Sequence, residues 1–203
     1  MNGLDQLRQE FPWPEECPKV PKSLAFDGLP DGWCCGENIA MFGRLCNDET
    51  DVIIELGSWL GRSALHLLGA APKATLICVD HWEGSAEHRS HPEWKLKLPT
   101  LYETFLRHLW AYRSRVIPLR GTTLFGLDKI ASLKIPVKVI YIDASHDPLP
   151  VKADISKARE NFPEAVVCGD DWTWESVREG VRLALAAGPP CTLGTARTCW
   201  WLE

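Results

Sequence analysis

The 203-residue chain lacks the features that mark membrane-spanning, secreted and nucleic-acid-coating proteins. No apolar run reaches the roughly 20 residues that cross a bilayer, and the charged first ten residues offer no apolar signal-peptide core. The 22 Lys and Arg residues are outnumbered by 27 Asp and Glu, so no basic excess is present to neutralise phosphates. We therefore expect a cytoplasmic protein with neither a nucleic acid nor a membrane as its partner, and small-molecule chemistry becomes the leading functional class.

The eight cysteines contain no C-x-x-C pair. Cys78 and Cys168 lie inside apolar runs that are typical of strands, so we expect reduced thiols that pack as small core residues. A disulfide framework would require secretion, which nothing in the sequence indicates. Hydrophobic residues make up 45% of the chain and charged residues 24%, values of a globular protein rather than of a disordered or fibrous one.

Residues 1–31 carry five prolines, at positions 12, 14, 18, 21 and 30. Proline interrupts helices, so this segment predicts an extended arm without regular helix that lies on the domain or on a partner. Such an arm leaves self-association into a homo-oligomer open. The length of the chain accommodates one domain, which we place at residues 32–203.

From residue 36 onward, helical and strand-like patterns alternate. Apolar strand patterns occupy residues 51–56, 75–80, 116–119, 137–143 and 165–168, and helical patterns occupy 36–47, 61–70, 98–112, 122–132, 149–160 and 174–187. This alternation predicts an α/β fold in which a doubly wound, mostly parallel sheet carries helices on both faces. Residues 190–203 predict a closing pair of strands. Sheets of this kind bind ligands beyond the carboxyl ends of their strands.

The first predicted strand ends in the sequence Glu55-Leu-Gly-Ser-Trp-Leu-Gly-Arg-Ser63, where Gly57 and Gly61 form the turn into a helix. A dinucleotide site usually reads G-x-G-x-x-G, so the missing middle glycine disfavours an NAD-dependent oxidoreductase. The acid Glu55 would repel phosphate and suits a cation. Asp80, at the end of the second strand, can accept hydrogen bonds from both hydroxyls of a ribose. Together the two acids favour a cationic nucleoside without phosphates.

These residues resemble the class I methyltransferases that use S-adenosylmethionine. The segment 55–65 looks like their first motif, Asp80 like the ribose-binding acid, and Gly121-Thr-Thr like the segment beside the adenine. Residues 141–155, Tyr-Ile-Asp-Ala-Ser-His-Asp-Pro-Leu-Pro-Val-Lys-Ala-Asp-Ile, are similar to the macrocin-type sugar and catechol-like O-methyltransferases, with an alanine and a proline in place of the usual glycine and aromatic. The resemblance implies a Rossmann-like fold, S-adenosylmethionine as cofactor, and a small hydroxylated molecule as methyl acceptor.

The same resemblance implies which residues contact the cofactor. They are Glu55, Gly57, Ser58, Gly61, Ser63, Asp80, His81, Trp82, Gly121, Thr122, Thr123 and Asp143. Two of them have an alternative interpretation. Glu55 could be a solvent-facing or helix-capping acid, and Trp82 could be ordinary packing beside the sheet.

Three carboxylates follow neighbouring predicted strands. Asp143 ends the fourth strand, and Asp170 and Asp171 follow the fifth, so the three should meet at one edge of the sheet. Bare carboxylates would repel one another, whereas a hard divalent cation with oxygen ligands removes the repulsion. We expect Asp143, Asp170 and Asp171 to hold Mg²⁺, which the resemblance also implies. The alternative is that Asp170 and Asp171 merely cap the next helix.

His146 and Asp143 are the candidate catalytic residues, because a histidine has a suitable pKa for a general base and both lie after the fourth strand. A hydrogen bond to its own loop or to the next helix start is the alternative role of His146. The polar segment 83–99 predicts a mobile cover over the acceptor. The expected activity is Mg²⁺-assisted methyl transfer to a hydroxyl group; a metal-independent N- or O-methyltransferase and a non-catalytic nucleoside-binding module are the alternatives.

Overall fold

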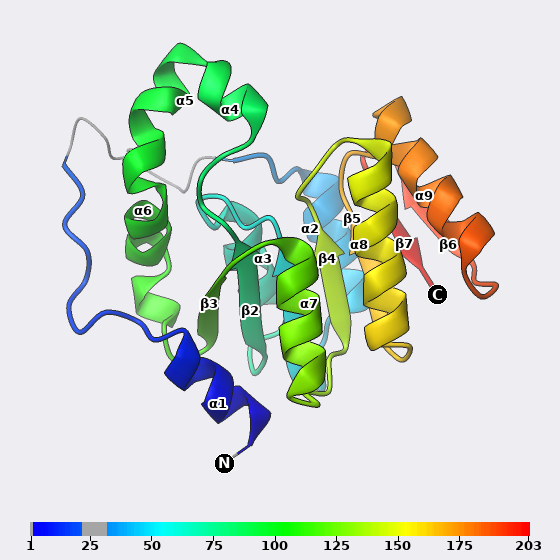
Figure 1. The fold of residues 1–203 in the computed structure, drawn as a ribbon. Coiled ribbons are helices and arrows are strands. Elements are labelled where there is room, and N and C mark those ends of the chain that lie inside the picture. The colour runs from blue at the N-terminus through cyan, green and yellow to red at the C-terminus, as the bar shows by residue number, and fades with distance from the viewer. Residues whose placement is uncertain (1, 22–31) are drawn as a thin grey trace.

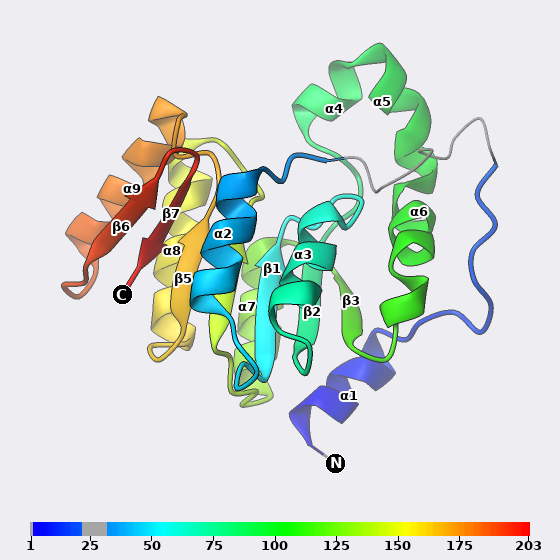
Figure 2. The same cartoon turned by 180° about the vertical axis from the view of Figure 1, so that it is seen from behind.

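The computed structural model describes residues 2–21 and 32–203. Within these residues one sheet has the strand order β3-β2-β1-β4-β5-β7-β6 (Figure 1, Figure 2). Its strands are β1 (Val52–Leu56), β2 (Thr75–Asp80), β3 (Val116–Arg120), β4 (Val139–Ile142), β5 (Val166–Gly169), β6 (Leu193–Ala196) and β7 (Cys199–Leu202). Strands β1 to β5 run parallel, and β7 pairs antiparallel with β5 and β6. The mostly parallel sheet with a closing strand pair is thus confirmed.

The central strands are apolar throughout because both of their faces are covered. All five residues of β1 are buried, as parallel strands between two layers of helices require. The strand order reverses between β1 and β4, so the loops that follow these two strands lead to opposite faces of the sheet. In doubly wound folds, ligands bind in the crevice between two such loops.

Helices cover the two faces of the sheet in separate groups (Figure 1, Figure 2). One face carries α2 (Gly36–Leu45), α3 (Arg62–Ala70) and α6 (Leu101–His108), and the other carries α7 (Thr123–Ser132), α8 (Pro148–Asn161) and α9 (Glu175–Ala187). Strand side chains alternate between the two apolar cores. Tyr141 packs in the core of the first face, while Ile140 and Ile142 pack in that of the second.

The connection between β2 and β3 is mostly helical. It contains α4 (Ala86–Ser90), α5 (Pro92–Lys97), α6 and two short 3₁₀ helices at Leu98–Thr100 and Trp110–Tyr112. Helices α4 and α5 project beyond the carboxyl ends of the strands, where the sequence predicts a cover (Figure 1). The mobility of this cover stays a prediction. None of the helices in the described part of the chain combines the length and apolar character that a bilayer crossing requires.

The predicted absence of helix from residues 1–31 is wrong for α1 (Gly3–Glu10). The prolines of this segment all follow Glu10, and the side chain of Asn2 caps the helix by accepting a hydrogen bond from the Asp5 amide at 2.9 Å. Leu7 is completely buried in the core of the second face. The first part of the predicted arm is therefore packed against the domain, and residues 22–31 lie outside the described residues.

All eight cysteines are free thiols. Five of them are buried, at positions 34, 46, 78, 168 and 199. Burial raises the pKa of the Cys78 and Cys168 thiols well above the ordinary value, so both stay protonated. The prediction of reduced cysteines that pack as core residues is confirmed for these positions.

Candidate active site

A cavity of about 900 Å³ opens at the carboxyl ends of the parallel strands. It has the size at which proteins enclose a cofactor together with a small ligand. Most of the predicted cofactor residues line it or a small adjoining pocket of about 90 Å³: Gly57, Asp80, His81, Gly121, Thr122, Thr123 and Asp143 line the cavity, and Ser58 and Ser63 line the pocket. Glu55, Gly61 and Trp82 line neither.

Asp80 is held at the cavity edge by two loops. Its Oδ2 accepts a hydrogen bond from the Trp59 amide at 2.9 Å, and its Oδ1 accepts one from the Trp82 amide at 2.7 Å. The side chain is only 13% exposed. Because each carboxylate oxygen keeps a second lone pair, a fixed Asp80 can still accept hydrogen bonds from the hydroxyls of a ligand.

Gly57 joins the loops that follow β1 and β4. It has a φ of +87°, and a Cβ atom at this position would lie 2.1 Å from the backbone oxygen of Asp143. Only glycine fits such a contact. The glycine at position 57 therefore lets the loop after β1 pack closely against the loop that carries Asp143.

Glu55 does not reach the cavity. It is completely buried, and it accepts a hydrogen bond from the Ser63 hydroxyl at 2.6 Å. Burial raises its pKa above the ordinary value. The structure gives no support to a cofactor contact, and the alternative of a solvent-facing acid is wrong. The physical reason is strand geometry: Glu55 lies within β1 rather than after it, and its side chain points toward α3.

Trp82 is a core residue. It is 2% exposed, and its ring packs against Tyr102 and Phe105 at centroid distances of 4.8 and 4.7 Å. Its Nε1 donates a hydrogen bond to the backbone oxygen of Trp59 at 2.9 Å. The structure thus gives no support to a contact between Trp82 and the cofactor, and the alternative of ordinary packing describes the residue.

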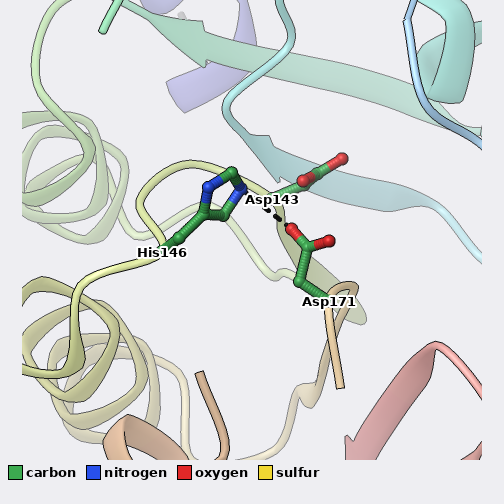
Figure 3. A group of neighbouring side chains, drawn as sticks. All are labelled: Asp143, His146 and Asp171. Carbon is green, nitrogen blue, oxygen red and sulfur yellow. Dashed lines mark ion pairs between the residues drawn. The ribbon is translucent and has the colours of Figure 1, made fainter. Parts of the chain in front are cut away.

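Asp143, His146 and Asp171 converge at the cavity (Figure 3). Each offers one ligand atom, and these atoms lie within 4.8 Å of one another. The Nε2 atom of His146 is 2.9 Å from Oδ2 of Asp171, and the His146 ring packs against Trp174 at a centroid distance of 4.5 Å. Helix α9 has Trp174 as its N-cap, so the alternative in which Asp170 or Asp171 caps that helix is wrong.

Asp170 lies beside this cluster and adds a further carboxylate to the cavity. It is 9% exposed, lines the cavity, and has a buried Oδ1 atom without a hydrogen-bond partner. Burial first, and then the adjacent Asp171, raise its pKa to about 6. Burial and the charges of Asp170 and Asp171 raise the pKa of Asp143 well above its usual range.

The residues present fit a divalent cation. A cation would offset the repulsion among the three carboxylates and would provide a partner for the orphaned Oδ1 of Asp170. Carboxylate oxygens suit Mg²⁺ and Mn²⁺, and an imidazole is added here by His146. The group of neighbouring ligand atoms differs from the predicted Asp143, Asp170 and Asp171: it contains His146, expected to be a base, and Asp170 lies beside it.

Sequence reasoning missed the aromatic side chains of the cavity. Trp33, Trp59, His88 and Trp94 line it, and the His88 ring stacks on Trp59 at a centroid distance of 4.1 Å. Trp33 and Trp174 are 61% and 46% exposed, unusual values for such large apolar side chains. The signal was the count of ten tryptophans, which does not say where they lie. These rings give the cavity apolar walls around its carboxylates.

Asp154 is a second missed residue. It lies on α8, is 3% exposed and lines the cavity. Its Oδ1 accepts a hydrogen bond from the Thr123 hydroxyl at 2.6 Å. Burial raises the pKa of Asp154 to about 6.

A methyltransferase family model and several solved methyltransferase structures are similar to this chain. The family model described as a methyltransferase domain matches residues 54–172, more than half of the chain. A comparison with curated protein sequences gave no match. Among solved structures, the chain is similar to the O-methyltransferase TomG of Streptomyces achromogenes, which is involved in tomaymycin synthesis and was solved with S-adenosylmethionine. The identity is 20% and the TM-score 0.60, over 99% of this chain and 96% of that one.

Two further structures show the same fold. An O-methyltransferase from Bacillus cereus in complex with S-adenosylhomocysteine is 18% identical, with a TM-score of 0.56 over 99% of this chain and 97% of that one. The calicheamicin methyltransferase CalS11 is 16% identical, with a TM-score of 0.54 over 82% of this chain and 77% of that one. The Rossmann-like fold implied by the sequence resemblance is thereby confirmed.

Proposed function

The chain belongs to the methyltransferase domain family, and from this premise we propose that it transfers a methyl group from S-adenosylmethionine to a hydroxyl oxygen of a small molecule, assisted by Mg²⁺. The observation that carries the proposal is the placement of Asp143, His146 and Asp171 within 4.8 Å of one another in a cavity that also contains Asp80. The O-methyltransferases of similar structure support the choice of oxygen as acceptor.

In this proposal the residues at one end of the cavity bind the cofactor and those at the other end bind the acceptor. Asp80 and Gly121–Thr123 form the end that suits the nucleoside, because a fixed carboxylate accepts hydrogen bonds from ribose hydroxyls. Asp143, Asp171 and His146 form the acceptor end. When bound, S-adenosylmethionine supplies a methyl group on a sulfonium that is already a good leaving group. The protein therefore mainly orients the reactants, an effect that can be worth about 7–11 kcal/mol.

The acceptor end contains groups that can bind a cation and groups that can accept a proton. Asp143, Asp171 and His146 would hold the cation, and the Asp170 carboxylate beside them would add negative charge. Bound Mg²⁺ would lower the pKa of an acceptor hydroxyl and orient its oxygen. His146 and Asp143 are the residues positioned to hold the proton that leaves this hydroxyl. The aromatic side chains of the cavity offer apolar surface to an acceptor bound beside these groups.

Chelation tests the metal. With labelled S-adenosylmethionine and a panel of small hydroxylated acceptors, excess chelator should abolish methyl transfer while S-adenosylhomocysteine still binds, because different residues hold the two groups. Asp171→Ala should reproduce the effect of the chelator. Asp48→Ala is the matched control, since Asp48 is an exposed acid before β1 that lines neither the cavity nor the small pocket. Full transfer in chelator, with no divalent ion in the purified protein, would refute the metal.

A metal-independent methyltransferase is the second candidate, and the 2.9 Å pair between His146 and Asp171 favours it. A carboxylate that pairs with an imidazole orients it as a general base without any cation. In that case activity survives chelation and His146→Ala abolishes it. A nucleoside-binding module without turnover would bind S-adenosylhomocysteine and methylate no acceptor. The cytoplasmic location, the absence of nucleic-acid and membrane partners, self-association, and the division into a 1–31 arm and a 32–203 domain stay predictions.

A further inference from the structure

A chain of buried polar side chains lies directly beneath Asp143. Tyr141 precedes Asp143 by two residues and is completely buried. Its hydroxyl donates a hydrogen bond to Oδ2 of Asp143 over 3.3 Å. The ring itself is fixed by Phe42, which meets it edge-on at a centroid distance of 4.9 Å and an interplanar angle of 90°. The hydroxyl position is therefore set by packing.

Asn38 of α2 continues the chain. It is completely buried, and its Nδ2 donates a hydrogen bond to the Tyr141 hydroxyl at 2.9 Å. Its Oδ1 in turn accepts from the Cys35 thiol at 2.7 Å. Since Asn38 donates to the Tyr141 oxygen, the hydroxyl proton of Tyr141 is left to point at Asp143.

We propose that Asn38 and Tyr141 are positioning residues, which hold the Asp143 carboxylate in the orientation that the acceptor and cation require. The proposal rests on the proposed function, in which Asp143 acts at the reacting atoms. Buried polar groups are costly unless they are hydrogen-bonded, and a phenylalanine at 141 with a leucine at 38 would fill much the same space without that cost. The arrangement fits an outer set of partners that orients a ligating carboxylate, as such partners do around metal sites.

The substitution Tyr141→Phe tests the proposal because it removes the hydroxyl and keeps the ring. Mn²⁺ affinity, measured by electron paramagnetic resonance, should weaken about 10-fold, in the range found for outer partners of metal ligands. The kcat for methyl transfer should fall about 10-fold, with the acceptor KM and the S-adenosylhomocysteine affinity unchanged. The control is Thr104→Val, which removes another buried hydroxyl, that of Thr104 in α6, which donates a hydrogen bond to the backbone oxygen of Thr100.

A second variant tests the direction of the hydrogen bonds. In Asn38→Asp a carboxylate replaces the amide donor, so the Tyr141 hydroxyl would donate to residue 38 instead of Asp143, and the variant should resemble Tyr141→Phe. Intact S-adenosylhomocysteine binding shows that each variant is folded. The proposal is overturned if Tyr141→Phe matches Thr104→Val in both Mn²⁺ affinity and kcat, or if its loss of activity comes with an equal loss of S-adenosylhomocysteine binding.

The failure of the proposed function gives a different pattern. If the wild-type protein methylates no hydroxyl but binds Mn²⁺, the positioning role is tested by whether Tyr141→Phe binds Mn²⁺ more weakly than Thr104→Val. If the wild-type protein methylates an acceptor without binding Mn²⁺, the role is tested by whether Tyr141→Phe has a lower kcat than Thr104→Val. A wild-type protein that does neither overturns both proposals.

Discussion

Asp80 both binds the protein backbone and lines the cavity in which we propose that the cofactor binds. It accepts hydrogen bonds from the amides of Trp59 and Trp82, which belong to the loops after β1 and β2. Losing its charge would therefore weaken ligand binding both directly and by loosening these loops. A single carboxylate thus links the shape of the nucleoside end to its chemistry.

We expect Asp80→Asn to weaken S-adenosylhomocysteine binding about 10- to 100-fold, because each hydrogen bond to a charged group contributes about 1.5–3 kcal/mol. The asparagine amide would also face one of the two backbone N–H donors. Isothermal calorimetry measures the affinity, with Glu83→Gln, an exposed acid nearby, as the control. Equal affinities for the two variants would show that Asp80 does not face the nucleoside.

Because Asp154 is buried, we expect the free energy of unfolding to depend on pH. Its pKa is about 6 in the folded protein against an ordinary value of 3.8, so the folded state favours the protonated acid. The resulting stabilisation is complete below about pH 3.8 and is lost as the pH rises through about 6. Relative to wild type, Asp154→Asn should gain stability between pH 4 and 8, by about 3 kcal/mol at most.

Urea unfolding at several pH values measures this difference. Asp128→Asn is an opposite control, because the partners Asn161 and Lys157 lower the pKa of the exposed Asp128. The stabilisation from Asp128 is present at neutral pH and is lost as the pH falls toward its lowered pKa. If the Asp154→Asn difference is independent of pH, the burial of this acid does not control its ionisation.

At the scale of the element, helix α1 is a part of the core rather than an appendage. Leu7 is completely buried, and beyond the helix the Trp13 indole donates a hydrogen bond to the Val116 backbone of β3 at 2.8 Å. We expect Leu7→Ala to lower the free energy of unfolding by about 2–5 kcal/mol, the range for buried leucines. Gln9→Ala, on the exposed side of the same helix, should change it by less than about 0.5 kcal/mol.

Chemical denaturation compares the two variants. Equal stabilities would indicate that α1 detaches from the domain in solution. Because α1 lies within residues 1–31, we expect the removal of this segment to destabilise the domain.

The parallel strands and their order of appearance could be predicted from the sequence because strands buried on both faces leave continuous apolar runs. Helix α1 could not, since only Leu4 and Leu7 mark its inner side, and its stability comes from tertiary packing. Carboxylates placed directly after strands, such as Asp143 and Asp171, could be assigned to the site from topology alone. Glu55 and Trp33 could not, because the direction of one side chain and the path of a loop decide where each lies.

For the whole molecule, the cavity predicts a coupling between ligand and stability. S-adenosylhomocysteine that binds only the folded state should stabilise it by about 2.7 kcal/mol at a hundredfold excess over Kd. For a chain of this size that corresponds to a rise of about 5–10 °C in Tm. Differential scanning calorimetry checks this value. An unchanged Tm at millimolar ligand would contradict the assignment of the cavity to this cofactor.

The loop that carries Asp170 and Asp171 depends on contacts with the last residues of the chain to be synthesised. The Trp200 indole donates a hydrogen bond to the Asp170 backbone at 3.0 Å, and the Trp172 amide donates one to the Thr198 backbone at 2.7 Å. The loop of Asp170 and Asp171 is therefore braced by residues that the ribosome adds some thirty positions later. During synthesis the proposed nucleoside end of the cavity is therefore made before the proposed acceptor end is complete. A chain that ends before β7 would contain Asp170 and Asp171 without the backbone contacts that hold their loop.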